Sequence, residues 1–299
     1  AKGKMPTDSF TLLDGGMGQE LIKRSSRKPT PLWSADVLRD CPELVVETHC
    51  DFIKAGSDVI TLSSYSVTPT RLAKYNRENE FEILQKIAVE AAQKAAQTFN
   101  TKPLIAGCLP PLPGSYRPSE RLTEQESYTE YQRITECQFK HVDLFICETM
   151  SSVEEACIST TVAKQTGLPV WTSFTVDEDN GELLRSGEPI LDGAKAVLAK
   201  GASAILINCS PPESITQAVE KLVALGAEIG AMANGFVTTE PLKGNTTVDV
   251  LVSRLELTPQ KYVTFTKDWL SKGAKIIGGC CEIGPQHIAE INKIREARD

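Results

Sequence analysis

Eight short apolar runs recur along the chain, and each is followed by a longer segment with helical periodicity. The runs begin at Phe10, Asp58, Pro103, Asp143, Pro169, Ser203, Glu228 and Ala274. Strands that are buried on both faces appear as continuous runs of Val, Ile and Leu, and regular alternation with helices indicates βα units around a parallel sheet. Eight units predict a single-domain (β/α)8 TIM barrel.

Helix boundaries support the same repeat. Helices are predicted over 42–56, 78–99, 123–141, 152–167, 189–200, 212–225, 258–272 and 285–296. Several end at a glycine just before the next strand, and Thr123 with Glu126 has the spacing of a capping box. Because barrels of about 250 residues commonly form one domain, we expect an N-terminal extension over 1–9 and one barrel domain over 10–299.

The long irregular segments all follow strands. They are predicted over 21–41, 110–122, 176–189 and 235–257. In a (β/α)8 barrel such segments lie at the C-terminal face, where the active sites of these barrels are found. Catalytic and binding residues are therefore expected at strand ends.

Three cysteines occupy strand ends. Cys209 ends the sixth run, and Cys280 and Cys281 end the eighth. The chain has nine cysteines, an odd number, and no secretory features, so its thiols are expected to be reduced. Three convergent thiolates would leave one coordination position of a zinc ion open, as in catalytic sites. The alternatives are a disulfide between the two adjacent cysteines or simple burial of small side chains.

Two acidic residues also follow apolar runs, Asp14 in "LLDGGMG" and Glu148 in "ICETM". A carboxylate at a strand end is costly to desolvate without a partner, so both are candidates for binding a ligand's ammonium group. Alternatively, one caps a turn and the other begins a helix. The backbone amides of Gly15 and Gly16 could meet a ligand's carboxylate. Asn234 in "MANGF" is either a metal ligand or part of an Asn-Gly turn.

Composition argues against several classes of protein. The net charge is −7, with acids and bases interspersed, which disfavours nucleic-acid binding. No apolar stretch approaches the roughly 18 residues of a membrane span, and the N-terminus lacks a signal-peptide core, so we expect a cytoplasmic protein. No feature indicates an oligomeric state. Trp33, Tyr65 and Tyr116, near the predicted rim, could bind a methylated cation.

The motifs "LLDGGMGQEL", "PLWSADVL", "CETMSSVEEA", "INCS" and "IIGGCC" follow one another along the chain. In this order they resemble the homocysteine S-methyltransferases, and the resemblance covers essentially the whole chain. It implies a (β/α)8 barrel in which Cys209, Cys280 and Cys281 bind Zn2+ and the homocysteine sulfur takes the open position. In some family members a side chain fills that position when substrate is absent, and Asn234 is our candidate.

The resemblance also implies the substrates. Asp14 and Glu148 would hold homocysteine, and the Gly15 region would meet its carboxylate. The donor would be a methyl sulfonium, S-methylmethionine or S-adenosylmethionine, and the product methionine. The segments "GCLPPLPGSYRP" and "MANGF" depart from the pattern of that branch. A betaine donor, a selenocysteine acceptor and a non-catalytic homocysteine- or zinc-binding protein therefore stay as alternatives.

Overall fold

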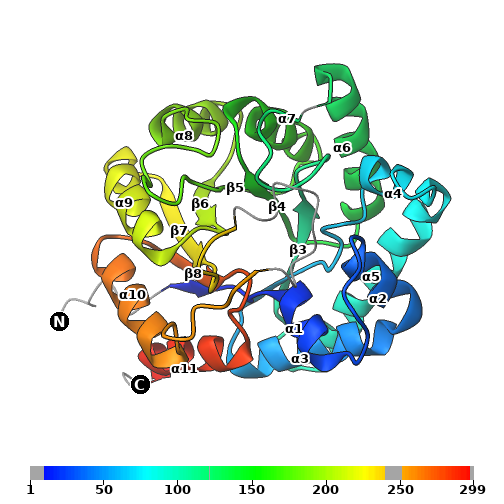
Figure 1. Ribbon diagram of the computed structural model, residues 1–299, viewed down its shortest axis with the longest axis horizontal. Helices are drawn as coiled ribbons and strands as arrows, with labels where there is room; N and C mark the ends of the chain where they lie inside the picture. The colour runs from blue at the N-terminus through cyan, green and yellow to red at the C-terminus, as the bar shows by residue number, and fades with distance from the viewer. Residues whose placement is uncertain (1–9, 121, 240–250, 297–299) are drawn as a thin grey trace.

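A ring of parallel strands surrounded by helices forms the molecule (Figure 1). The computed structural model describes residues 10–120, 122–239 and 251–296, so the predicted extension over 1–9 lies outside the described residues. Hydrogen-bonded strands follow the order β1-β8-β7-β6-β5-β4-β3-β2, and a parallel bridge between Leu13 and Val59 joins the first strand to the second. The predicted (β/α)8 barrel is confirmed.

All eight predicted strands form. They are β1 Thr11–Leu12, β2 Val59–Thr61, β3 Leu104–Leu109, β4 Leu144–Met150, β5 Val170–Phe174, β6 Ala204–Asn208, β7 Glu228–Ala233 and β8 Ile276–Gly279. The α-helices are α1 Met17–Arg24, α2 Trp33–Asp40, α3 Pro42–Ala55, α4 Pro69–Ala73, α5 Phe81–Gln97, α6 Glu124–Gln138, α7 Val153–Lys164, α8 Ile190–Ala199, α9 Pro212–Leu222, α10 Pro259–Ser271 and α11 Pro285–Glu296. None of the helices in the described ranges combines the length and apolar character of a membrane span.

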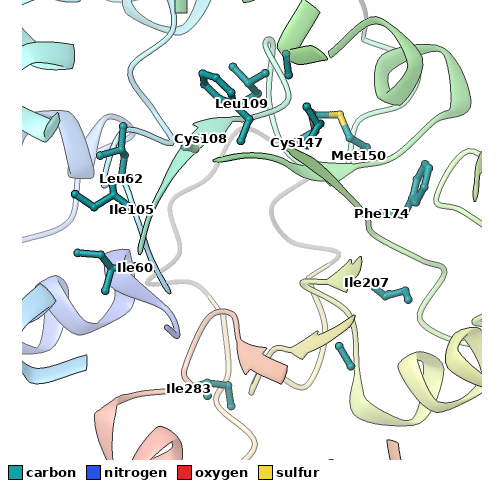
Figure 2. Packing of buried hydrophobic residues seen from close by; sticks show 14 of the residues in the cluster. Ile60, Leu62, Ile105, Cys108, Leu109, Cys147, Met150, Phe174, Ile207 and Ile283 are labelled. Carbon is teal, nitrogen blue, oxygen red and sulfur yellow. The ribbon is translucent and has the colours of Figure 1, made fainter. Parts of the chain in front are cut away.

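Alternation along the strands builds two apolar layers. In β6, Ala204 and Leu206 belong to a cluster inside the barrel, whereas Ile205 and Ile207 belong to the larger cluster between barrel and helices. Figure 2 shows Ile207 pointing away from the barrel toward the surrounding helices. Both faces of each strand are thus buried, which explains why the strands appear in the sequence as unbroken apolar runs.

The prediction that 21–41 is irregular is wrong. The structure forms α2 within this segment, and α1 extends into it from Met17. Each helix has only eight residues, too few for a clear periodic signal, and each is stabilised by packing of buried residues such as Leu21 and Leu38 against the core. These helices bring Trp33 to the rim of the barrel.

Predicted capping is confirmed at α6, where Thr123 and Glu126 form a reciprocal capping box. At the start of α7, Ser152 accepts a hydrogen bond from the amide of Glu155, but the Glu155 carboxylate accepts from the amide of Ser151. The glycine stops are confirmed as well. Gly56 ends α3 in the left-handed region, with φ of 119°.

His49 on α3 is fully buried, and within the described residues neither ring nitrogen has a hydrogen-bond partner. Burial lowers its pKa from 6.5 to about 4. Between these values the unfolded chain binds more protons than the native protein, so native stability decreases as pH falls. We expect the free energy of unfolding to fall by about 2 kcal/mol from this group between pH 7 and pH 5.

Urea titrations at these two pH values measure the effect. His49→Leu should remove about 2 kcal/mol of the difference between them. The matched control is His141→Gln, since His141 is exposed and the substitution should leave the difference unchanged. An equal pH dependence in wild type and His49→Leu would contradict the assignment.

Candidate active site

A cavity of about 350 Å³ opens at the C-terminal ends of the strands. Its lining includes the predicted site residues at the ends of β1, β4, β6 and β8: Asp14, Gly15, Glu148, Cys209, Cys280 and Cys281. The aromatic residues Trp33, Tyr65 and Tyr116 line it too. The six residues that were predicted from strand ends therefore line one cavity.

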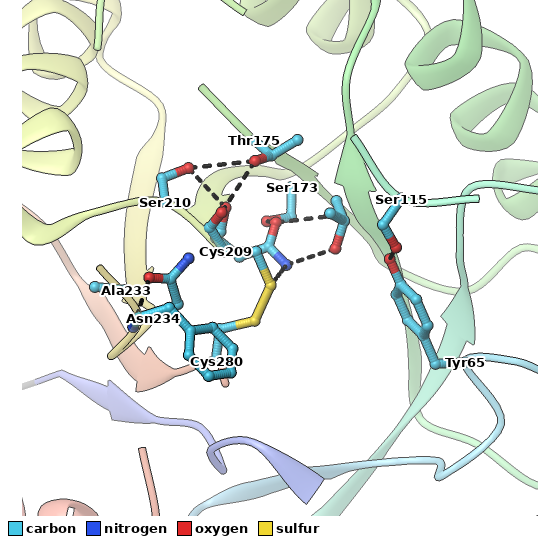
Figure 3. Close-up of a disulfide and its surroundings, with 12 residues drawn as sticks. Tyr65, Ser115, Ser173, Thr175, Cys209, Ser210, Ala233, Asn234 and Cys280 are labelled. Carbon is cyan, nitrogen blue, oxygen red and sulfur yellow. Dashed lines mark hydrogen bonds between the residues drawn. A yellow bond between two sulfur atoms is a disulfide. The ribbon is translucent and has the colours of Figure 1, made fainter. Parts of the chain in front are cut away.

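Cys209, Cys280 and Cys281 form a compact cluster in which all three sulfurs lie within 4.8 Å of one another. A disulfide joins Cys209 to Cys280, whose Cα atoms are 5.4 Å apart, and Cys281 is free (Figure 3). The expectation of reduced thiols is thus wrong for this pair, because the ends of β6 and β8 bring the two residues within bonding range. The alternative of a disulfide between adjacent cysteines is also wrong.

The three sulfurs fit one zinc ion. Sulfurs around a tetrahedral zinc with Zn–S distances of about 2.3 Å are separated by roughly 3.8 Å, and these sulfurs already lie within 4.8 Å of one another. Reduction of the Cys209–Cys280 bond frees the sulfurs for coordination. A set of three sulfurs facing a cavity leaves the fourth position accessible to a ligand there.

Cys209 is held in an uncommon backbone conformation, with φ of 49°. Its amide donates to the carbonyl of Met232, and its carbonyl accepts from Thr175 Oγ1 at 3.2 Å and from Arg185 Nη2 at 3.0 Å. Asn208 Nδ2 lies 3.6 Å from the Cys209 sulfur. This network sets the direction of the sulfur.

Arg185 was not among the sequence candidates, although it contacts several parts of the site. Its side chain is only 4% exposed, and its guanidinium lies 4.5 Å from the centre of the Tyr116 ring. Glu178 pairs with it at 3.4 Å and in turn accepts from the backbone amide of Thr239. Arg185 thereby connects the segment over 176–189 to Cys209 and to the aromatic wall.

Glycines allow β1 and β8 to approach closely. A Cβ atom on Gly16 would lie 2.5 Å from the carbonyl oxygen of Cys280, and one on Gly278 would lie 2.7 Å from Cβ of Leu13. Contacts this short do not occur, so any side chain here would force the strands apart. Because these glycines have no side chains, the backbone after Asp14 lies against the cysteine cluster.

Asp14 and Glu148 are the two acids of the cavity. Asp14 Oδ2 accepts from the amide of Thr61 at 2.8 Å, and Glu148 Oε2 accepts from Cys108 Sγ at 2.7 Å. Burial raises the pKa of both groups to about 7, and the negative charge of Glu148 adds to the shift at Asp14. Two desolvated acids are strongly favourable partners for a bound cation.

Asn234 is not among the residues that line the cavity. Its side-chain oxygen accepts from the amide of Phe236 at 3.3 Å, and its own amide donates to the carbonyl of Ser210. These are the contacts of an Asx turn, the alternative that the Asn-Gly sequence offered. The proposed fourth metal ligand is therefore engaged in a local turn.

Comparisons with known proteins identify the family of the chain. The family described as homocysteine S-methyltransferase matches residues 11–295. The chain is 27% identical over 323 residues to homocysteine S-methyltransferase 4 of Zea mays, covering 96% of this chain and 90% of that protein. It is 27% identical over 320 residues to selenocysteine methyltransferase of Astragalus bisulcatus, covering 95% and 91%.

Solved structures of the homocysteine methyltransferase MmuM from Escherichia coli are similar over 97% of this chain and 96% of MmuM. The metallated form superposes with a TM-score of 0.79 at 27% identity, and the oxidized form with 0.80 at 26% identity. The similarity thus extends over the complete barrel.

Proposed function

Because this chain belongs to the homocysteine S-methyltransferase family, we propose that it transfers a methyl group from a sulfonium donor to the thiolate of homocysteine. The donor is S-methylmethionine or S-adenosylmethionine, and the product is methionine. The observation that supports this most directly is the single cavity that combines three clustered cysteine sulfurs with two buried carboxylates. An amino acid with a terminal thiol matches both features.

Homocysteine is held at both ends in this proposal. Its ammonium group pairs with Asp14 and Glu148, and its carboxylate meets the backbone amides at Gly15 and Gly16. The close approach of Gly16 to Cys280 leaves only a short span between amides and sulfurs, which suits a small amino acid. The substrate thiol is thereby directed at the cysteine cluster.

Cys209, Cys280 and Cys281 would hold Zn2+ in this proposal, because their sulfurs match the donor set of a catalytic zinc site. When bound, zinc would keep the substrate thiol ionised near pH 7, where a free thiol with a pKa near 8.5 is only about 3% thiolate. Arg185 and Asn208 maintain the orientation of Cys209.

The methyl transfer itself needs no further cofactor. A lone pair on the homocysteine sulfur forms the new S–CH3 bond while the donor S–CH3 bond breaks, and its electron pair stays on the donor sulfur as a neutral thioether. Opposite charges are neutralised in this step, so a cavity lined by Trp33, Tyr65 and Tyr116 favours it over bulk water. Aromatic faces also attract the methylated cation.

Metal analysis and a panel of methyl donors test the proposal. The reduced protein is expected to bind about one zinc per chain, as three thiolates with one open position imply. With homocysteine it should form methionine from S-methylmethionine or S-adenosylmethionine. Glycine betaine as donor and selenocysteine as acceptor complete the panel. Zinc retained without turnover of any sulfonium or betaine donor would contradict the proposal and indicate a binding protein.

A further inference from the structure

Three basic side chains line the cavity without a place in the function proposed above: Arg71, Lys74 and Arg117. Arg117 pairs with Glu120 at 3.2 Å, so the inference concerns the other two. Arg71 lies in the short helix α4 and Lys74 directly follows it, so both come from the segment after β2. The loop after β3, which contains the sequence "PPLPGSY", lies beside them. Neither residue was a sequence candidate, because cationic residues on a short helix usually face solvent.

The two cations are turned toward backbone carbonyls and an aromatic ring. Arg71 donates through Nε and Nη2 to the carbonyl of Pro111 at 3.2 and 2.6 Å, and its guanidinium lies 4.9 Å from the centre of the Tyr65 ring. Lys74 Nζ donates to the carbonyl of Pro113 at 2.8 Å. Among the residues that the structure describes, neither has a carboxylate partner within 4.0 Å.

Positive charge is therefore only partly compensated at this wall, where Glu120 pairs with Arg117 at 3.2 Å and offsets part of the repulsion at Lys74. Partial burial lowers the pKa of Lys74, and repulsion from Arg117 and Arg71 lowers it further. A bound anion would relieve that repulsion, since an opposite charge at hydrogen-bond distance favours the protonated lysine. The wall thus has the electrostatic character of a carboxylate-binding site.

The wall lies across the barrel from the cysteines. In the ring of eight strands β3 is opposite β7, and the cysteines end β6 and β8 on either side of β7 (Figure 1). Figure 3 shows Tyr65, the ring beneath Arg71, on the far side of the cavity from Cys209 and Cys280. The aromatic and basic wall therefore faces the sulfur cluster.

The geometry of methyl transfer relates the position of the basic wall to that of the cysteines across the cavity. A nucleophilic sulfur, the methyl carbon and the leaving sulfur must lie in line at the moment of reaction. With the acceptor thiol at the cysteines, the donor's onium centre lies in mid-cavity, and the rest of the donor extends toward the opposite wall. In the function proposed above, homocysteine is held by Asp14 and Glu148, and Arg71 and Lys74 take no part in that binding, so these two cations are assigned to the donor.

We propose that Arg71 and Lys74 bind the carboxylate of the methyl donor and so select onium donors that carry an anionic group. The proposal rests on the methyl-transfer function proposed above and deepens it. It explains the departure of the "PPLPGSY" loop, whose carbonyls at Pro111 and Pro113 hold both cations beside the cavity. Donors without a carboxylate, such as trimethylsulfonium, would lack this anchor.

Paired donors test the assignment. Reduced, zinc-loaded protein is titrated calorimetrically with S-methyl-L-methionine and with its methyl ester, and methionine formation from each is measured at saturating homocysteine. In wild type the acid should bind about tenfold or more tightly than the ester, the scale of one charge-assisted hydrogen bond. Arg71→Met and Lys74→Met should each bring this ratio close to one, whereas Arg71→Lys should retain most of it.

A control variant and the outcomes that would contradict the proposal complete the test. The exposed Arg133→Met on α6 is the matched control and should leave the ratio unchanged. If Arg71 and Lys74 only stabilise the loop, their substitution would lower the binding of acid and ester equally, and this result would overturn the proposal. A rise in the KM of homocysteine alone would also overturn it. If no donor gives turnover, the proposed function fails, but the calorimetric ratio still decides whether Arg71 and Lys74 bind a carboxylate.

Discussion

Cys209→Ala, Cys280→Ala and Cys281→Ala are each expected to abolish zinc binding and lower kcat/KM by about a thousandfold or more while the barrel stays folded. The loss follows because a Lewis-acid metal supplies several kcal/mol of stabilisation to the reaction, and a site with two thiolates holds zinc poorly. The fold survives because the three residues lie at strand ends, beyond the two apolar layers of the barrel.

Metal content by mass spectrometry, methionine formation and near-UV circular dichroism separate these effects. The measurements are made with reductant, so that loss of the Cys209–Cys280 disulfide does not contribute. Cys157→Ala on α7 is the matched control and should keep zinc and activity, since Cys157 does not line the cavity. Full zinc and full turnover in any one of the three variants would rule out a three-thiolate site.

Local patterns were sufficient to predict the barrel. Strands such as Ala204 to Asn208 are buried on both faces, so their apolar runs are visible without knowledge of the neighbours, and a glycine precedes several of them. The helices α1 and α2 escaped prediction because eight residues span barely two turns, and packing of Leu21 and Leu38 against distant elements decides their conformation.

The site was predictable only where residues stand at strand ends. Topology alone brings Asp14, Glu148 and Cys209 to one rim, because parallel strands of a barrel all end on the same face. Arg185 and Arg71 lie in segments whose course depends on contacts with other loops, such as the carbonyls of Cys209 and Pro111. No periodicity in the sequence encodes such contacts, so these residues emerge only from the structure.

Asp14→Asn and Glu148→Gln are expected to raise the KM of homocysteine about tenfold to a hundredfold each, with zinc content unchanged. Each substitution keeps the size of the side chain and removes one charge-assisted contact to the ammonium group, worth about 1.5–3 kcal/mol. Neither residue belongs to the sulfur cluster, so metal analysis should match wild type. Glu136→Gln, on an exposed position of α6, should change nothing.

The pH dependence of homocysteine binding discriminates further. Both acids have a pKa of about 7 in the protein without substrate and must be ionised to pair with ammonium, so affinity should fall as pH drops below about 7. For each unit by which pH falls, the logarithm of the KM of homocysteine should rise by up to about two in wild type and by about one in Glu148→Gln. In that variant the rise should begin at a lower pH, because Glu148 no longer raises the pKa of Asp14. If Glu148→Gln had the same pH profile as wild type, the assignment of Glu148 to the ammonium site would be wrong.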